Sequence, residues 1–224
     1  MKVRVFFGVL VIVACCVVCP ESQVSVDGLT VSKPKVWADA WVSNFTENSW
    51  YFLQGNGTIK GTFKYQVDQT QARMRISRDT GKSDRFCGSI YPFSSTPCDH
   101  LIRDGKRYIV FPEKKYCCLC CTASQGCGVV KNNWAENATA ITSSVPGVNL
   151  YLIKGLQNNF YGEDATTGTP AKIYMEPISD MVFDTKTYSD APKFTDDDFA
   201  LPKDSGDCEK KCPYLSMCTL ASLA

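Results

Sequence analysis

Residues 58–79 read TIKGTFKYQVDQTQARMRISRD, and this stretch decides the fold. From residue 58 to 68 the odd positions are mostly apolar and the even positions polar. From residue 72 to 77 small or apolar residues alternate with arginine and serine. Successive side chains of a strand point to opposite faces of a sheet, so each half predicts a strand with one inward face. The turn-prone DQTQ between them predicts an antiparallel hairpin.

The rest of the chain repeats this strand pattern and has few helix signals. Short apolar runs between the turn sequences DGK, PG, NN and TGTP predict further strands over 36–42, 107–111, about 138–142, 150–154, 172–175 and 181–184. Short helices are expected in KNNWAENA (131–138), after the capping residue Thr195, or near CEKKC (208–212). The stretch 189–207 is expected to cross the sheet as an irregular segment. The fold class is therefore mainly β.

The chain begins with the layout of a secretory signal peptide. Lys2 and Arg4 precede an apolar run from Val5 to about Val18, which is short for a membrane span. We predict a signal peptide over residues 1–22 and a single domain over 23–224, with a cysteine-rich tail at about 205–224. The cleavage point and a retained signal anchor stay open. No later stretch approaches the ~20 apolar residues of a spanning helix, so a secreted or lumenal chain without a transmembrane segment is expected.

Ten of the 13 cysteines follow the signal peptide, and an even number suits a fully oxidised set. In YCCLCCTASQGCG (116–128), adjacent cysteines of an extended backbone point to opposite faces. This segment is therefore expected to be tied both to the 87–98 loop and to the tail. A zinc or redox C-x-x-C site is the alternative, but an oxidising compartment does not supply free thiolates. Structural disulfides, with their pairing open, are predicted among Cys87, Cys98, Cys117, Cys118, Cys120, Cys121, Cys127, Cys208, Cys212 and Cys218.

The charge balance and the short motifs of the sequence limit the kinds of partner that the chain is expected to bind. The chain has 24 basic and 23 acidic residues, which is not the basic footprint of a nucleic-acid-binding protein. No nucleic-acid partner is therefore expected. Three N-glycosylation sequons begin at Asn44, Asn56 and Asn137, and they are typical of an exported glycoprotein.

Catalytic signatures are scarce in the sequence. His100 is the single histidine, and no G-x-S-x-G elbow is present, so a hydrolase would depend on His100 as its base. We expect His100 in an exposed loop beside a disulfide. Glu163-Asp164 and the acids at 196–198 are expected in loops or at a helix start, although a glycosidase uses such pairs. No catalytic residue, metal or cofactor is predicted, and weak calcium binding by the acidic run stays open.

Four pieces of the sequence, in their order and spacing, resemble the ependymin-related secreted proteins. They are GTFKYQVDQTQARMRISR, RYIVFPEKKYCC, CGVVKNNWAENAT and DDFALPKDSGDC, within roughly residues 35–208. The resemblance implies an antiparallel sheet strongly curved into a half-barrel or sandwich, like that of bacterial lipoprotein carriers, with an apolar cavity for a lipid or other hydrophobic ligand. It also implies calcium and glycan contacts, although a D-x-D-x-D-G loop is missing. The doubled CCLCC and the cysteines at 208–218 exceed the usual family pattern and leave the disulfide map open.

The resemblance favours a binding protein, and the aromatic content agrees with it. The chain has 12 Phe, 10 Tyr and 4 Trp, and the inward residues of the hairpin would line a pocket or fill a core. We predict a secreted, non-catalytic protein that shelters a hydrophobic small molecule or lipid. An adhesion or matrix glycoprotein with a solid core and a hydrolase using His100 are the alternatives, and a homodimer stays open. The residues predicted to line the cavity are Phe63, Tyr65, Val67, Met74, Ile76, Trp134 and Tyr151.

Overall fold

A computed structural model describes residues 33–221, except 52–54, 156–157 and 177. The chain divides into two units, Met1–Val31 and Ser32–Ala224, and only the second contains described residues. The predicted signal peptide thus lies outside them. Within the described part of the chain, no helix has the length and apolar character needed to cross a bilayer.

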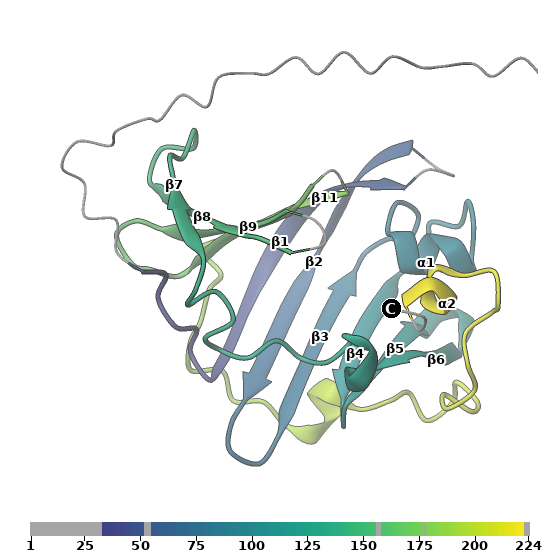
Figure 1. Cartoon of the computed structure of the whole chain (residues 1–224). Helices are drawn as coiled ribbons and strands as arrows, with labels where there is room; N and C mark the ends of the chain where they lie inside the picture. The colour runs from purple at the N-terminus through teal and green to yellow at the C-terminus, as the bar shows by residue number, and fades with distance from the viewer. Residues whose placement is uncertain (1–32, 52–54, 156–157, 177, 222–224) are drawn as a thin grey trace, which may run out of the picture. The chain divides into compact units, whose positions relative to one another are not determined.

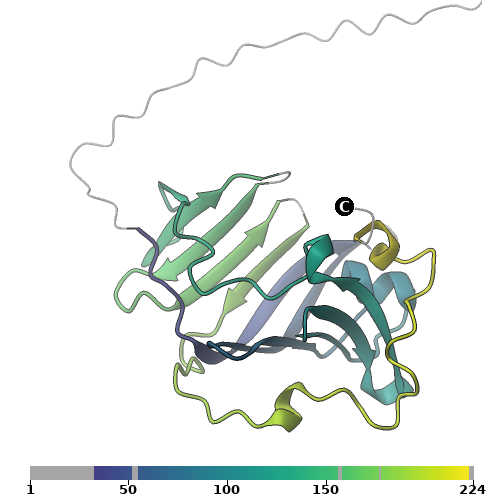
Figure 2. The same cartoon turned by 60° about the horizontal axis from the view of Figure 1, so that its bottom comes forward.

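The described residues form one antiparallel sheet of eleven strands, in the order β6-β5-β4-β3-β2-β1-β11-β10-β9-β8-β7. The sheet is strongly curved, and its edge strands β6 and β7 do not pair with each other in the described residues (Figures 1 and 2). The strands are β1 (Ala40–Tyr51), β2 (Gly55–Val67), β3 (Ala72–Arg78), β4 (Cys98–Arg103), β5 (Lys106–Phe111), β6 (Tyr116–Thr122), β7 (Thr139–Ile141), β8 (Val148–Ile153), β9 (Asn159–Asp164), β10 (Pro170–Met175) and β11 (Ser179–Phe183). The predicted fold class, a mainly β, curved antiparallel sheet, is confirmed.

The predicted hairpin is formed by β2 and β3. Phe63 pairs with Ile76 and Tyr65 with Met74, so the apolar residues of both strands share one face. The Asp68 carboxylate closes the turn by accepting hydrogen bonds from the backbone N–H groups of residues 70 and 71, at 2.8 and 3.0 Å. An aspartate that binds the backbone two or three residues ahead favours a tight turn, so the register follows from the local sequence.

Strands β4, β5 and β6 are covered on both faces. The α1 (Arg85–Ile90) and α2 (Met217–Ala221) helices pack with one face, together with Ile109 and Phe111. The segment that contains Phe194 and Phe199 packs on the other, against Leu101. The predicted irregular segment 189–207 therefore does cross the sheet. We call strands β4–β6, both helices and residues 194–221 the disulfide arm.

Five disulfides connect the ten predicted cysteines, and all lie in the disulfide arm or directly after β6. They are Cys87–Cys98, Cys117–Cys208, Cys118–Cys212, Cys120–Cys218 and Cys121–Cys127. Three of them tie β6 to the tail, as predicted. The expected link between β6 and the 87–98 loop is wrong, because Cys87 and Cys98 bond to each other. Cys120 and Cys121 share one buried cluster, since the β5–β6 register shifts beside them.

Several predicted elements differ from the structure. The stretch 36–42 enters β1 only at Ala40, and residues 131–138 and 208–212 form turns in place of helices. Strands β4, β6 and β9 and helices α1 and α2 were not predicted. The capping start at Thr195 is confirmed in part, because it opens the short 3-10 helix Asp196–Phe199 with a complete capping box.

Candidate functional site on the concave face

The concave side of the sheet carries a continuous buried cluster of large side chains, which we call the aromatic face. Its members come from the inward positions of β1, β2, β3, β4, β8, β9 and β11 and from the segments that cover them. They are Trp37, Trp41, Phe45, Phe63, Tyr65, Met74, Ile76, Ile102, Ala135, Tyr151, Tyr161, Met181 and Phe183. Inward residues of neighbouring strands lie close together, so a curved sheet gathers them onto its hollow side.

Trp37 lies at the centre of the ring packing. It makes edge-to-face contacts with Trp41 and Tyr65, each at 5.1 Å between centroids, and with Trp134 at 5.3 Å. Beneath it, the Trp41 and Phe63 rings stack at 4.7 Å with an interplanar angle of 6°. Aromatic pairs prefer these offset and edge-to-face geometries. The centre of the aromatic face is therefore filled by rings of the chain itself.

Two irregular segments, residues 33–39 and 129–138, cover the aromatic face, and we call them the strap. The Trp37 backbone N–H donates to the Asn132 carbonyl at 2.9 Å. The Asn132 side-chain amide donates to the Asp39 carboxylate at 2.8 Å, and the Tyr65 hydroxyl donates to the Val130 carbonyl at 3.0 Å. In Figures 1 and 2 the second segment runs across the hollow side of the sheet. None of the five disulfides between described residues joins the strap to the sheet.

All seven residues predicted to line a cavity lie in this cluster or against it. Val67 and Trp134 are partly buried and the other five are buried. The sequence reasoning missed Trp37, Trp41, Phe45 and Tyr161. The alternation of inward Trp41 and Phe45 with exposed Asn44 and Thr46 was the signal available for β1.

Several polar atoms of the aromatic face are buried without a partner. Among the described residues, the indole nitrogens of Trp41 and Trp134 find no hydrogen-bond acceptor. The Trp37 indole and the Tyr161 hydroxyl likewise make no well-aligned hydrogen bond in this part of the chain. Burial raises the pKa of Tyr161, and the neighbouring Trp37 N–H only partly offsets this rise. Each unpaired buried donor costs about 1–3 kcal/mol, so an added acceptor oxygen would stabilise the face.

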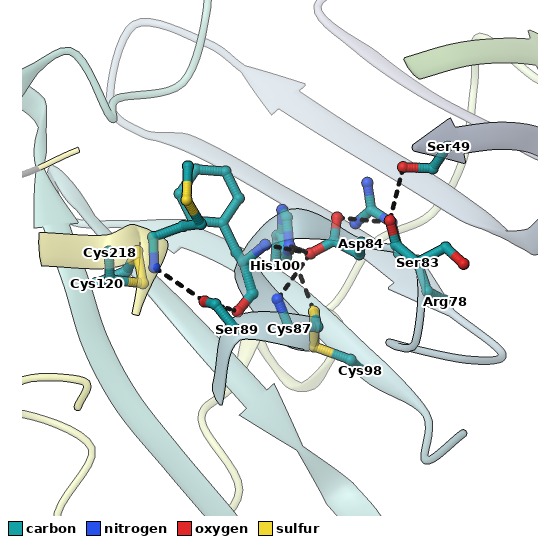
Figure 3. A network of polar contacts seen from close by, with 12 residues as sticks. Ser49, Arg78, Ser83, Asp84, Cys87, Ser89, Cys98, His100, Cys120 and Cys218 are labelled. Atoms are coloured by element: carbon teal, nitrogen blue, oxygen red, sulfur yellow. Dashed lines mark hydrogen bonds and ion pairs between the residues drawn. A yellow bond between two sulfur atoms is a disulfide. The ribbon is translucent and has the colours of Figure 1, made fainter. Parts of the chain in front are cut away.

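A buried polar network lies beside the aromatic face, where β1, β3, β4 and α1 meet (Figure 3). Arg78 Nε lies 3.1 Å from Glu47 Oε2 and 3.5 Å from Asp84 Oδ2. Asp84 Oδ1 lies 3.0 Å from His100 Nε2 and also accepts the backbone N–H groups of Phe86 and Cys87 in the first turn of α1. Figure 3 shows Asp84 between Arg78 and His100. Ser179 donates to the second oxygen of Glu47 at 2.8 Å, which completes that carboxylate's contacts.

Burial and neighbouring charges shift the pKa values of Asp84 and His100 in this network. Burial raises the pKa of Asp84, but the charges of His100 and Arg78 and the hydrogen bonds to its carboxylate hold that pKa well below its usual value. Burial and the nearby Arg78 and Arg107 lower the pKa of His100, although Asp84 acts in the opposite direction. At neutral pH, a neutral His100 therefore donates its Nε2–H to an ionised Asp84. At the low pH where Asp84 would titrate, His100 is protonated, and its charge then opposes protonation of Asp84.

The prediction that His100 lies in an exposed loop is wrong, because it is a buried residue of β4. Its Nε2 also lies 3.5 Å from the Cys87 sulfur, which is already bonded to Cys98. Among the described residues, no serine or free thiol makes a hydrogen bond to His100. Ligand atoms of Asp84, Cys87 and His100 lie within 4.8 Å of one another, but a disulfide sulfur does not bind metal as a thiolate would. We therefore assign these contacts a structural role.

The acidic residues considered for glycosidase chemistry have structural partners. Glu163 is a buried residue of β9, not a loop residue, and it accepts the Tyr151 hydroxyl at 2.7 Å and the Lys35 backbone N–H at 2.9 Å. Asp164 caps the turn that follows. In the irregular segment 189–207, Asp196 pairs with Arg73, and Asp198 pairs with Lys64, each at 2.7 Å. The acidic run therefore attaches this segment to the basic outer face of the hairpin.

The hollows of the described residues include two outside the aromatic face. One of about 610 Å³ is at the ends of β1, β2, β10 and β11 and includes Trp50 and Asp180. The other, of about 600 Å³, lies between β6 and the tail and includes Lys211 and Tyr214. Neither is lined by any of the seven predicted cavity residues. Because rings of the chain pack on one another at the centre of the aromatic face, a ligand there requires side chains or the strap to move.

No family model matches the chain, and no curated protein matches it. The ependymin resemblance therefore remains a resemblance of sequence pieces. Among solved structures, the chain is similar to a LolA superfamily protein from Nitrosomonas europaea, with a TM-score of 0.34 and 9% sequence identity. The match covers 75% of this chain and 94% of that protein. A likeness of this size carries no functional argument, so function is argued from the residues alone.

Proposed function

We propose that the chain is a non-catalytic binding protein that holds a hydrophobic molecule with an oxygen acceptor against the aromatic face. The unpaired indole N–H groups of Trp41 and Trp134, buried among the described residues, are the observation that carries this proposal. A carboxylate, ester or hydroxyl oxygen would accept from them, while the surrounding rings contact the apolar part of the ligand. Ligand sites typically combine an apolar lining with a small number of polar groups in this way.

Binding includes displacement of the strap, because Trp37 fills the centre of the face in the ligand-free chain. The strap is suited to such a movement, since it contains no cysteine and its backbone forms no strand with the sheet in the described residues. Its ends are attached to the sheet, because the Val67 backbone N–H donates to the Asp39 carbonyl at 2.7 Å and the Cys121–Cys127 disulfide lies just before residue 129. Segments with few hydrogen bonds open at lower free energy than strands at the centre of a sheet. The sheet beneath would keep its shape while the cover opens.

An exported location belongs to the same proposal. Five disulfides between described residues favour an oxidising compartment. The three sequon residues, Asn44, Asn56 and Asn137, are exposed and thus accessible to glycosylation. These features support a secreted or lumenal glycoprotein, for which a lipid or similar molecule is the expected ligand.

Tryptophan quenching by a brominated fatty acid tests this function. The chain has four tryptophans, and Trp50, at the end of β1, is the one that neither belongs to the aromatic face nor packs against it. A Trp50→Phe protein therefore emits only from Trp37, Trp41 and Trp134. Saturable quenching of this protein, with no quenching by a brominated alkane that lacks the acceptor oxygen, is expected. Absence of saturable quenching by the fatty acid would contradict the proposal.

Met74 provides a second, independent variant for the same assay. It is buried on β3 beside the aromatic rings, so Met74→Trp should reduce fatty-acid uptake while costing about 1–3 kcal/mol of stability by overpacking. Met74→Leu conserves volume and should bind like the parent. Uptake is measured with a fluorescent fatty acid so that the added indole does not interfere. Equal uptake by the tryptophan variant and the parent would place the ligand away from β3.

An adhesion or matrix protein is the second candidate function. The stacked Trp41 and Phe63 and the central position of Trp37 favour it, because a filled face is what a solid core would have. Extraction of the native protein followed by mass spectrometry separates the two functions. Recovery of a hydrophobic molecule supports the binding protein, whereas an empty extract together with absent quenching supports the solid core.

A further inference from the structure

The segment between Cys212 and Cys218 presents two large apolar side chains to solvent. Tyr214 is 83% exposed and Leu215 is 92% exposed, and both exceed Phe93, which is 71% exposed. Single exposed apolar residues are common on proteins, but two neighbours at this exposure are unusual. We call residues 213–216 the knob.

The knob is rigid at its base. Disulfides from Cys212 and Cys218 fasten both of its ends to β6. Within it, the buried Ser216 hydroxyl and backbone N–H both donate to the Pro213 carbonyl, at 2.6 and 2.9 Å. The Thr219 hydroxyl donates to the Tyr214 carbonyl at 2.6 Å. The backbone of a closed, cross-linked turn is already fixed, so it loses little conformational freedom when its side chains enter an apolar phase.

Two lysines flank the knob on its N-terminal side. Lys210 and Lys211 are exposed, and neither forms an ion pair within the described part of the chain. Two nearby acidic residues form ion pairs, Glu209 with Lys106 and Asp204 with Lys115. Asp207 forms no ion pair among the described residues, and its carboxylate accepts the Glu209 backbone N–H at 3.0 Å. Two unpaired lysines against this one carboxylate leave a net positive charge beside the knob, which complements a negatively charged partner surface.

We infer that the knob is a docking element for an anionic lipid surface. Tyrosine and leucine side chains enter the interfacial and acyl regions of a bilayer, and lysines beside them attract acidic headgroups. A stable protein interface buries about 800 Å² on each partner, which is more than this short turn presents. Weak, reversible attachment through two side chains and two lysines is the mode that the knob supports. The inference does not depend on which ligand occupies the aromatic face.

Vesicle co-sedimentation of the full secreted chain tests the inference. The parent should bind vesicles with about one quarter phosphatidylserine and bind pure phosphatidylcholine vesicles weakly. Leu215→Ser should weaken binding to the anionic vesicles about tenfold, since it removes the most deeply inserted side chain. Lys210→Ala with Lys211→Ala should weaken binding by about fivefold per lysine and reduce its salt dependence. All these residues are exposed, so the variants should fold like the parent.

Val145→Ser is the matched control. Val145 is 42% exposed and lies in the β7–β8 turn, at the opposite edge of the sheet from β6, so this variant should bind vesicles like the parent. A parent that binds neither kind of vesicle, or a Leu215→Ser protein that binds as well as the parent, would overturn the inference. A parent dimer abolished by Leu215→Ser, seen in analytical ultracentrifugation, would also overturn it, because the knob would then contact a second copy. Leu215→Ser should leave fatty-acid quenching of the core tryptophans unchanged, so the failure of one proposal is distinguishable from the failure of the other.

Discussion

The disulfide arm and the aromatic face use large buried side chains in different ways. In the disulfide arm, both faces of β4–β6 are covered, and disulfides join α1 to β4 and the tail to β6. On the aromatic face, the cover is the strap, and ring packing and a few hydrogen bonds hold it. The disulfide arm is thus held by covalent bonds, whereas the strap over the aromatic face is held by non-covalent contacts. We infer that the disulfide arm preserves the curvature that the aromatic face needs for binding.

The largest expected effect comes from removing a ring of the aromatic face. Trp41 is fully buried and stacks on Phe63, so Trp41→Ala should destabilise the chain by about 3–5 kcal/mol, because no covalent link compensates for the lost packing. Urea unfolding followed by circular dichroism measures the change. Trp50→Ala, at a 45% exposed position, is the control and should stay within about 0.5 kcal/mol of the parent. A similarly small change in the free energy of unfolding for Trp41→Ala would mean that ring packing does not stabilise the chain as proposed.

The next largest effect concerns the disulfides that hold the disulfide arm together. Replacing both Cys118 and Cys212 with alanine opens a loop with a sequence separation of 94 and should cost about 2–4 kcal/mol in urea unfolding. The Cys121–Cys127 bond spans only six residues in sequence, so its double alanine variant should cost less. Fatty-acid quenching should persist in both variants at low urea. Loss of quenching in the folded Cys118 and Cys212 variant would mean that the aromatic face depends directly on the arm.

The sequence predicts strands by two signals, alternation and short apolar runs between turn residues. The β2–β3 hairpin alternates because its outer face carries Lys64, Arg73 and Arg75, and β5 has the apolar run that ends in Phe111. β4 shows neither signal, because a strand covered on both faces does not alternate and its sequence CDHLIR is not an apolar run. His100 was placed in a loop for this reason. Asn159, Gly162 and Glu163 resembled loop residues, which concealed β9.

The candidate site was only partly predictable. Hairpin alternation identified Phe63, Tyr65, Met74 and Ile76, because a strand places them on one face. Trp37 and the strap could not be found this way, since their position depends on contacts between segments about a hundred residues apart. The disulfide pairing had the same limitation, because spacing does not determine which cysteines the tail brings to β6. The unpaired indoles follow from packing and have no sequence signal.

A smaller effect is expected for the attachment of the strap. Tyr65→Phe removes the hydrogen bond to the Val130 carbonyl and should cost about 0.5–1.5 kcal/mol while leaving the ring packing in place. Backbone amides of residues 129–138 should exchange hydrogen faster in this variant, because the strap opens more often. Tyr174→Phe on β10 is the control, and its exchange should match that of the parent. Unchanged exchange in Tyr65→Phe would show that the hydrogen bond does not hold the strap closed.

The smallest effect is a pH dependence that originates between the two regions, at His100. Burial holds its pKa below the ordinary value near 6.5, so the unfolded chain takes up this proton at a higher pH than the folded chain. The stabilising contribution of neutral His100 is complete above that ordinary value and is lost as the pH falls toward its lowered, folded-state pKa. Asp84, whose pKa is also lowered, loses its contribution only below its ordinary value of 3.8.

The chain has a single histidine, which makes this assignment unusually direct. The urea midpoint of the parent should therefore decrease from about pH 7 to pH 5, while that of His100→Asn should stay nearly constant over the same interval. Asparagine retains an N–H donor for Asp84 but does not titrate, so the variant separates the charge of the residue from its hydrogen bond. Parallel pH profiles for parent and variant would mean that His100 accepts its proton equally well in the folded and unfolded chains. The junction between the disulfide arm and the aromatic face would then not be the dry, positively charged environment that Arg78 and Arg107 create around this histidine.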